Sequence, residues 1–515
     1  MNIGDWITRW AERRPDKTAV VFEETPLSYK KVNERVNRAA RLLLRMGVKK
    51  GDRVGLLLYN CNQYLELFFA LSKIGGILVP LNYRLMPREL DYILNDSGCE
   101  TLVFDMEFVD RIEALKGRVP IKEGRFIRMG GTESPGSDRY PEYEALIGPE
   151  AALEPETAEP VGDGDVHIIM YTSGTTGFPK GAMLSHRKTF FNCLNADIYY
   201  GLTPDDVLLV ARALLHSGGL LVESAPMLYK GGTLIMKRRF RPEDILKAIQ
   251  KYKVTILEAP ATTFKFMLEQ TDISKYDLSS VRSYYTGGER VPPSLLRTYC
   301  ERGIVICQTY GQTETSTVTW LPRAEAVRKL GSVGVPVFHA DVRIVDKEGR
   351  QVKPGEVGEI TVSGPTVMNG YWGKPDLTKE TIKDGWLHTG DLARFDEEGY
   401  MYVVDREKDM FISGGENVYP AEIEKLYLEN PKISQVAVIG IPDEKWGEAG
   451  LAFIALNPGE TMTEQEAIDT CSGKLAKYKI PRQIRFVEAL PMTATEKVMR
   501  VKLRQDYLES LSKKG

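Results

Sequence analysis

The sequence has little of what marks a metal site, a disulfide framework or export from the cell. Its six cysteines include no Cys-x-x-Cys pair, and its five histidines fall in no metal-binding or hydrolase spacing. The amino terminus has no basic, apolar leader, and the most apolar stretch, residues 54–83, is interrupted by Glu66 and Lys73. These absences predict a cytoplasmic protein without disulfides, structural zinc or a transmembrane segment.

The sequence also lacks an excess of positive charge. Its 68 Lys and Arg residues are balanced by 71 Asp and Glu residues, which gives a formal net charge of −3. This balance argues against a nucleic-acid partner, so an anionic ligand needs donors that are concentrated at one site. The length of 515 residues is enough for about three compact units with a large core.

Apolar runs alternate with helical patterns through the first 340 residues, which predicts an α/β fold with buried, parallel sheets. Ser28 is placed to cap a helix whose apolar face runs from Val32 to Leu43. Residues 130–165 are rich in Gly, Pro, Ser and Glu without a sustained period, and we expect them to cross the surface between two subdomains. The later strand candidates are residues 166–171, 207–210, 254–257, 281–285 and 304–308, and the clearest helical pattern there is 262–269.

From residue 341 the pattern changes to short strands and tight turns. Residues 341–345 and 359–363 are strand candidates, which predicts a small β-barrel-like lobe. The charged run 405–409 then precedes a separate α+β pattern. We therefore predict a large N-terminal domain, residues 1–407, with two α/β subdomains and this lobe, and a small mobile α+β domain, residues 408–515.

A loop rich in hydroxyl groups and glycine follows the strand candidate 166–171. It reads Thr172-Ser-Gly-Thr-Thr-Gly-Phe-Pro-Lys-Gly181. Its glycines let backbone N–H groups turn toward an anion, while Lys180 supplies a mobile cation. It is not a Walker loop, because Pro179 stands where that pattern has its second glycine. A phosphate-binding loop is favoured over a simple surface turn.

A second loop, after the strand candidate 304–308, reads Thr309-Tyr-Gly-Gln-Thr-Glu314. The Glu314 carboxylate is a hard oxygen ligand of the kind that presents Mg²⁺ to a nucleotide. A lone Glu in a loop is more often solvated, but the two loops together predict a nucleotide site.

These loops resemble motifs of the adenylate-forming enzymes, the family of acyl-CoA synthetases, peptide-synthetase adenylation domains and beetle luciferases. The resemblance extends over nearly the whole chain, because further motifs follow in the family's order: Thr286-Gly-Gly-Glu289, Trp386-Leu-His-Thr-Gly-Asp391, residues 406–424 and Lys497. It implies an acyl-CoA ligase that needs ATP, Mg²⁺ and CoA. A carboxylic acid would attack ATP to give acyl-AMP and pyrophosphate, and CoA would then take the acyl group and release AMP.

The resemblance also implies roles for individual residues. Asp391 would bind the ribose diol with help from Arg406, Tyr310 would stack on adenine, and Glu314 would hold the metal. Thr172, Glu314 and Lys497 would be the catalytic residues. The implied ATP-binding set is Thr172, Ser173, Gly174, Thr175, Thr176, Gly177, Lys180, Gly288, Glu289, Tyr310, Gly311, Gln312, Thr313, Asp391, Arg406 and Lys497.

Lys497 matches the family's mobile catalytic lysine, whose ammonium neutralises charge between the attacking carboxylate and the α-phosphate. The sequence departs from the family pattern here, because Glu496 stands where a glycine usually precedes that lysine. Glu496 either makes the loop less permissive or adds a charge that counters Lys497. Asp405 likewise replaces a glycine before Arg406, a change that we expect to matter less.

Lys408 occupies the family's hinge position, which implies that the small domain rotates between the two half-reactions. In the second state the segment 413–420 would replace Lys497 and help shape a tunnel for the pantetheine arm of CoA. A turn that merely precedes a helix at residues 421–424 is the alternative. The implied CoA-binding residues are Ser413, Gly414, Gly415 and Glu416.

The carboxylic acid substrate is the part of the implied reaction that the sequence specifies least. The implied acyl pocket contains His216, Gly218, Gly219, Tyr285 and Gly287. Its small residues are expected to leave room behind His216, which either gates the pocket or packs in the core. This favours an aliphatic acid of medium or long chain, and the lack of an obvious cation disfavours a dicarboxylate or an amino acid.

Three alternatives stay open: an aryl-acid CoA ligase, loading of a carrier protein, and a luciferase-type oxidation. The sequence ends at Gly515 without a carrier domain, so we expect any carrier to be a separate polypeptide. A homodimer is compatible with these features.

Overall fold

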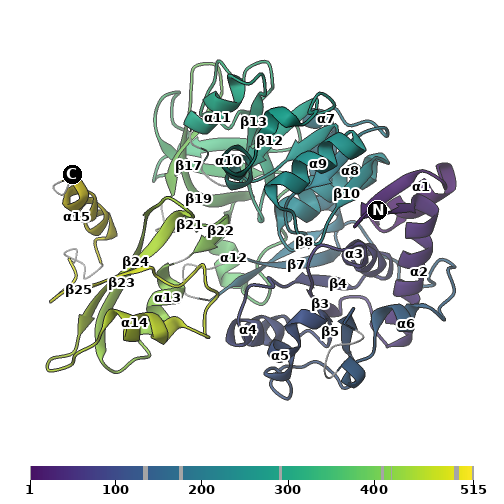
Figure 1. The fold of residues 1–515 in the computed structure, drawn as a ribbon, viewed down its shortest axis with the longest axis horizontal. Coiled ribbons are helices and arrows are strands. Elements are labelled where there is room, and N and C mark those ends of the chain that lie inside the picture. Colours follow the sequence, from purple (N-terminus) through teal and green to yellow (C-terminus); the bar gives the residue numbers. More distant parts are fainter. Residues whose placement is uncertain are drawn as a thin grey trace. The chain divides into compact units, whose positions relative to one another are not determined.

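A computed structural model (Figure 1) describes residues 2–131, 137–172, 178–288, 291, 293–406, 411–418, 420–491 and 498–512. The chain divides into two compact units. The first comprises Met1–Tyr83, Leu94–Tyr171 and Gly181–Asp405, and the second comprises Arg84–Ile93, Thr172–Lys180 and Arg406–Gly515. Helices and strands alternate as predicted, which confirms the α/β class. The hinge residue Lys408 lies outside the described residues, so the boundary at 407/408 stays a prediction.

The largest sheet of the first unit has nine strands among the described residues, and its central strands are parallel. The buried apolar strands of this sheet overlap the strand candidates predicted from the sequence, and β9 has the predicted bounds. Parallel strands are buried on both faces, which is why such runs are recognisable. In spatial order the strands are β15 (Val335–Pro336), β14 (Ser316–Trp320), β13 (Ile306–Gln312), β12 (Ser283–Gly287), β11 (Ile256–Glu258), β9 (Val207–Val210), β10 (Thr233–Met236), β1 (Thr18–Phe22) and β2 (Thr25–Ser28).

A second sheet of six strands carries the phosphate-loop candidate. Residues on either side of that loop belong to β7 and β8, which are neighbours at one edge of the sheet. Four of its strand pairs are parallel, as expected for an α/β subdomain. In spatial order the strands are β6 (Phe126–Met129), β5 (Thr101–Asp105), β3 (Arg53–Leu57), β4 (Ile77–Pro80), β7 (Val166–Thr172) and β8 (Lys180–Ser185).

Helices pack against these sheets through apolar side chains. The side chain of Ser28 accepts a hydrogen bond from the Lys31 N–H at 3.2 Å, which confirms the predicted cap of α2. In the first 400 residues the described helices are α1 (Asp5–Arg13), α2 (Tyr29–Arg45), α3 (Asn62–Ile74), α4 (Pro87–Ser97), α5 (Val109–Glu113), α6 (Tyr143–Ile147), α7 (His186–Tyr200), α8 (Ala225–Lys230), α9 (Pro242–Tyr252), α10 (Ala261–Gln270), α11 (Pro293–Cys300) and α12 (Pro375–Thr381), with a π-helix at Gly218–Ser224.

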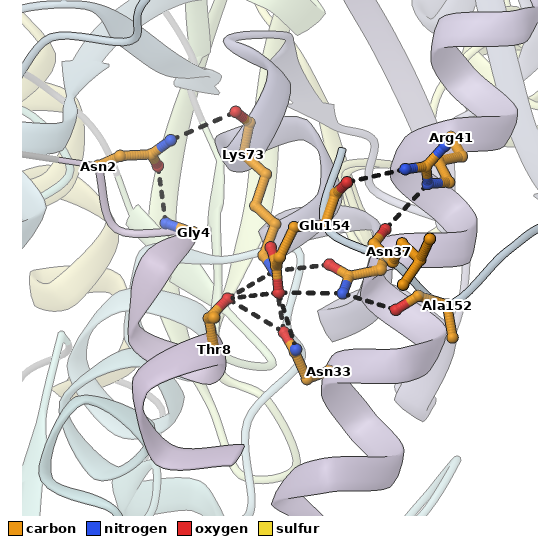
Figure 2. Close-up of polar contacts among 10 residues, drawn as sticks. Asn2, Gly4, Thr8, Asn33, Asn37, Arg41, Lys73, Ala152 and Glu154 are labelled. Carbon is orange, nitrogen blue, oxygen red and sulfur yellow. Dashed lines mark hydrogen bonds and ion pairs between the residues drawn. The ribbon is translucent and has the colours of Figure 1, made fainter. Parts of the chain in front are cut away.

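The stretch 130–165 is more ordered than its composition predicts, because it contains α6. Beyond α6, the segment is tied to the helices by a buried ammonium group. Figure 2 shows Lys73 of α3 among three polar side chains and Glu154, whose carboxylate lies 2.6 Å from Lys73 Nζ. The same ammonium donates to Thr8, Asn33 and Asn37. One buried cation thereby fixes α1, α2, α3 and the connecting segment together.

The predicted small β-rich lobe is present as a five-stranded sheet within the described part of the first unit. Its first strand has the predicted bounds. A separate cluster of buried aliphatic side chains, including Ile344, Ile360 and Val362, forms its core. The strands are β16 (Asp341–Val345), β17 (Gly358–Ser363), β18 (Ile382–Lys383), β19 (Trp386–Phe395) and β20 (Met401–Arg406).

The second unit is built around another five-stranded sheet, counted over its described residues. A long antiparallel pair, β23 and β24, dominates it, and β25 joins β24 in parallel. Over the described residues of the whole chain, no helix is both long and apolar enough to cross a membrane. The elements of this unit are β21 (Phe411–Ser413), β22 (Glu416–Val418), α13 (Pro420–Tyr427), β23 (Ile433–Asp443), β24 (Gly447–Leu456), α14 (Glu464–Cys471), β25 (Gln483–Phe486) and α15 (Arg500–Ser512).

Candidate functional site

The candidate site lies at the carboxyl edge of the nine-stranded sheet. Strands β9, β11, β12 and β13 run parallel, so the residues at their ends meet at one edge. In open α/β sheets this edge is where ligands bind. Arg212, Glu258, Gly287 and Tyr310 all lie at or just beyond these strand ends.

Three predicted ATP-binding residues contact one another: two of them donate hydrogen bonds to the carboxylate of the third, Asp391. Tyr310 Oη donates to Asp391 Oδ2 at 2.8 Å, and Gln312 Nε2 donates to the same oxygen at 2.7 Å. Gln312 Nε2 also donates to the carbonyl oxygen of Thr389 at 3.0 Å. Asp391 belongs to β19 of the lobe and is only 2% exposed. These bonds fix the orientation of a buried carboxylate, as a residue that binds a diol requires.

Glu314, the predicted metal ligand, is braced from residues 368–371. Its Oε1 accepts a hydrogen bond from Tyr371 Oη at 3.1 Å, and its backbone oxygen accepts one from the Met368 N–H at 2.8 Å. The described residues contain no cluster of three acidic, His or Cys side chains that would hold a metal alone. A single carboxylate is nevertheless sufficient where substrate phosphates complete the shell of Mg²⁺.

Lys188 is a site residue that the sequence analysis missed. It lies in the first turn of α7, is 1% exposed, and donates from Nζ to the hydroxyl of Ser316, two residues after Glu314. Burial lowers the pKa of Lys188 to about 7, against the opposing attraction of Glu314. A lysine in a helix after a Ser-His-Arg sequence has no distinctive spacing, so no sequence signal marked it.

The loop that contains Glu314 is tightly packed on itself. A Cβ at Gly311 would lie 2.2 Å from the backbone oxygen of Ser316, so only glycine fits there. Ser316 itself has a positive φ of 60°, which side-chain-bearing residues rarely adopt. Lys188 therefore supports a turn that the backbone alone would not favour.

The phosphate-loop candidates are only partly described. Thr172 ends β7 and Lys180 begins β8. Ser173, Gly174, Thr175, Thr176 and Gly177 lie outside the described residues. The predicted phosphate binding therefore stays a prediction.

Two of the predicted acyl-pocket residues, Gly218 and Gly219, are closely packed against the turn that follows β9. A Cβ at Gly219 would lie 2.4 Å from the carbonyl oxygen of Ala213, and one at Gly218 would lie 2.9 Å from Arg212 Cδ. The glycines at 218 and 219 thus permit close packing, and the expected room behind His216 stays a prediction. Tyr285 is buried, and its Oη donates to the Tyr199 carbonyl oxygen at 2.9 Å.

In the second unit, the four CoA-binding candidates form the turn of a hairpin. Ser413 and Glu416 are paired at the ends of β21 and β22, with Gly414 and Gly415 between them at positive φ. The Gly414 N–H donates to the Trp446 carbonyl oxygen at 2.9 Å. Helix α13 begins only at Pro420, so the turn belongs to the hairpin and not to the start of a helix.

Four other candidates cannot be placed in this site. Glu289, Lys408 and Lys497 lie outside the described residues. Arg406 ends β20, and its side chain is likewise not described.

Comparison with known proteins gives matches over almost the full length. The model of the AMP-binding enzyme family matches residues 7–372, and that of the AMP-binding enzyme C-terminal domain matches residues 422–497. A feruloyl-CoA synthase of Amycolatopsis sp is 40% identical, with 98% of this chain and 99% of that protein covered. An indoleacetate–CoA ligase of Aromatoleum aromaticum is 37% identical, with 98% of each chain covered.

A solved structure is similar over the same length. It is a double mutant of o-succinylbenzoate CoA synthetase from Bacillus subtilis, bound with the product analogue OSB-NCoA. The TM-score is 0.86 at 31% identity, with 97% of this chain and 98% of that chain covered.

Proposed function

The chain belongs to the AMP-binding enzyme family, in its adenylate-forming acyl-CoA synthetase branch, and on that premise we propose that its substrate is an aromatic carboxylic acid. It is an AMP-forming acid–thiol ligase, as its named relatives are. The relatives favour the aromatic alternative over the aliphatic acid that the sequence alone favoured, because feruloyl, indoleacetyl and succinylbenzoyl groups all carry a ring. This agreement carries the proposal.

The reaction proceeds in two displacements. A carboxylate oxygen of the acid attacks the α-phosphorus of ATP, the bond to the β-phosphate oxygen breaks, and pyrophosphate leaves with its electron pair. The sulfur of CoA then attacks the acyl carbon, loses its proton, and displaces AMP. Both steps depend on positioning and on neutralising charge, so no protein nucleophile is needed.

The residues around Asp391 are suited to hold the nucleotide in the first step. Asp391 would accept from the two ribose hydroxyls, while Tyr310 and Gln312 keep its carboxylate oriented. Lys180 and Lys497 would neutralise the phosphates and the attacking carboxylate. The hairpin at Ser413–Glu416 would take the place of Lys497 for the second step.

Glu314 would hold Mg²⁺, and the ion, when bound, would supply positive charge to the phosphates. The half-buried Glu314 carboxylate fits this group, since Tyr371 orients it without adding charge. Lys188 would keep the turn that carries Glu314 in place.

The experiment is turnover of the full chain with ATP, Mg²⁺, CoA and single acids: benzoate, ferulate, indole-3-acetate, octanoate or palmitate. Thioester and AMP are quantified by liquid chromatography. We expect AMP and thioester in equal amounts with at least one aromatic acid, at a higher kcat/KM than with either aliphatic acid. AMP formation without any CoA thioester would exclude CoA as the acceptor, and preference for palmitate would exclude the aromatic class.

A further inference from the structure

A buried charged cluster lies at the carboxyl edge beside the acyl-pocket candidates. It consists of Arg212, Glu223, Glu258 and Tyr200, called here the Arg212 cluster. Arg212 follows β9, Glu258 ends β11, and Glu223 lies in the π-helix Gly218–Ser224. Short π-helical segments are rare and are often found at functional sites.

The backbone that carries Arg212 is fixed from outside the sheet. Asn60 Nδ2 donates to the carbonyl oxygen of Arg212 at 2.8 Å, and Asn60 Oδ1 accepts from the Leu214 N–H at 2.8 Å. Both bonds come from one side-chain amide, which therefore holds the turn after β9 in a single position. The backbone position from which the Arg212 side chain extends is therefore fixed.

The guanidinium of Arg212 connects two segments of the predicted pocket wall. Its Nη2 donates to the Gly287 carbonyl oxygen at 2.9 Å, at the end of β12. On its other side, a Cβ at Gly218 would lie 2.9 Å from Arg212 Cδ. A Cβ at Gly288 would lie 3.4 Å from Arg212 Nη1. Arg212 thus fills the space between the π-helix and the two glycines at the end of β12, Gly287 and Gly288.

Two carboxylates hold this guanidinium. Glu223 Oε1 lies 3.1 Å from Arg212 Nε, and Glu258 Oε1 lies 3.8 Å from Nη2. Tyr200 Oη donates to the other oxygen of Glu258. Both carboxylates are almost fully buried, whereas the Arg212 side chain is 15% exposed. Burial raises the pKa of Glu223 to about 8, against the lowering effect of Arg212, and raises that of Glu258 to about 8.

We propose that Arg212 is a specificity-determining positioning residue of the acyl pocket. Held by Glu223 and Glu258, its planar guanidinium sets the distance between Gly218 in the π-helix and Gly287 at the end of β12. That distance defines the width of the pocket that receives the acid. The inference rests on the proposed function, because it names the residue that shapes the acid site of that ligase.

The first unit contains a matched control for this cluster. Arg35 of α2 is bound by Glu66 at 2.6 Å and by Glu144 at 2.5 Å, and Tyr143 Oη donates to Glu66 at 3.1 Å. The composition is the same: one guanidinium, two carboxylates and a tyrosine. The Arg35 side chain is 17% exposed, close to the value for Arg212. It joins α2, α3 and α6, and contacts none of the candidate site residues in the described structure.

The test compares Arg212→Lys, Arg212→Met and Arg35→Lys with the wild type in acyl-adenylate formation. KM for the best aromatic acid, KM for ATP, kcat and the thermal unfolding midpoint are measured for each. Loss of a charge-assisted hydrogen bond at the pocket wall should raise the acid KM of Arg212→Met by about 10- to 100-fold, with the ATP KM nearly unchanged. Arg212→Lys keeps the positive charge but not the planar guanidinium, so its acid KM should lie between those of Arg212→Met and the wild type.

Arg35→Lys should retain the wild-type acid KM even where its unfolding midpoint falls. Should Arg212→Met fail to fold, Arg212→Lys alone decides, because a raised acid KM at an unchanged ATP KM is the expected result. Equal acid KM values in Arg212→Lys, Arg35→Lys and the wild type would overturn the inference and leave the proposed function intact. Absence of wild-type turnover with every aromatic acid would overturn both.

Discussion

Tyr310 donates a hydrogen bond of 2.8 Å to Asp391, and this bond joins the end of β13 in the nine-stranded sheet to β19 in the small lobe. The two residues are 81 positions apart in the sequence. Their contact places a phenol and a carboxylate at the edge where the nucleotide is proposed to bind. The ring of Tyr310 and the oxygens of Asp391 are then available to different parts of one ligand.

Removing that bond should weaken nucleotide binding selectively. A hydrogen bond to a charged acceptor contributes about 1.5–3 kcal/mol, so Tyr310→Phe should raise the ATP KM about tenfold or more. The acid KM should change much less. Tyr276→Phe is the control, because Tyr276 Oη also donates to a carboxylate, that of Glu243, at an exposed position. Steady-state kinetics with varied ATP measures the effect, and an ATP KM equal to that of the control variant would refute the role of the bond.

Glu314→Gln should increase the enzyme's demand for magnesium. The substitution keeps the size of the side chain and an acceptor for Tyr371, but it removes the charge that would attract the ion. The free Mg²⁺ concentration at half-maximal rate should rise about tenfold or more. Glu325→Gln, at an exposed ion pair with Arg328, should leave it unchanged. The metal assignment is wrong if the two variants have the same Mg²⁺ dependence.

The Arg212 cluster should make the pocket reject acids that carry a second carboxylate. One guanidinium faces two buried carboxyl groups whose pKa is raised to about 8, so above that pH a further anion nearby meets uncompensated negative charge. At pH 9 we therefore expect kcat/KM for a para-carboxylated aromatic acid to be at least about tenfold below that of the parent acid. Glu258→Gln removes one negative charge and should bring the kcat/KM values of the two acids closer together. An unchanged ratio in that variant would argue that the cluster does not face the acid.

His186 should make the protein less stable in mild acid. Its Nδ1 accepts a bond from the Ile3 N–H, and its ring stacks on that of His167 at 4.7 Å. Burial lowers the pKa of His186 to about 4, against the raising effect of Asp165. In the unfolded chain His186 binds a proton near pH 6.5, whereas in the folded chain it does so only near pH 4. The contribution of neutral His186 to the free energy of unfolding is therefore fully present above pH 6.5 and is lost as the pH falls toward 4.

At pH 5 this loss amounts to about 2 kcal/mol for His186. Urea unfolding at pH 7.5 and pH 5 measures it, and His186→Gln should be less sensitive to the change of pH than the wild type. His339→Gln, at a half-buried position before the lobe, should keep the wild-type sensitivity. Identical pH dependence in all three proteins would contradict the assignment.

Much of the fold is predictable from local patterns, whereas the polar interior of the site is not. Strand β9 and the cap at Ser28 follow from an apolar run and from one side chain near its own helix. Helix α6 has only five residues, too few for a recognisable period within a Gly- and Pro-rich stretch. Such elements are formed by their tertiary contacts and not by local preference.

The residues of the site likewise fall into those that the sequence predicts and those that it does not. Tyr310, Gln312 and Asp391 are recognisable because they lie in compact motifs. Arg212 and Lys188 are single charged residues whose partners come from distant segments, and a lone charge in a sequence is most often solvated. Their burial and pairing become visible only when the strands are assembled.

Transfer of oxygen from the acid to AMP tests the central claim most directly. The full chain is supplied with an aromatic acid labelled with oxygen-18 in its carboxylate, together with ATP, Mg²⁺ and CoA, and the AMP is analysed by mass spectrometry. We predict labelled oxygen in the phosphate of AMP, because the oxygen that attacks the α-phosphorus stays there when the thiol takes the acyl group. Thioester formation with unlabelled AMP would contradict an acyl-adenylate intermediate.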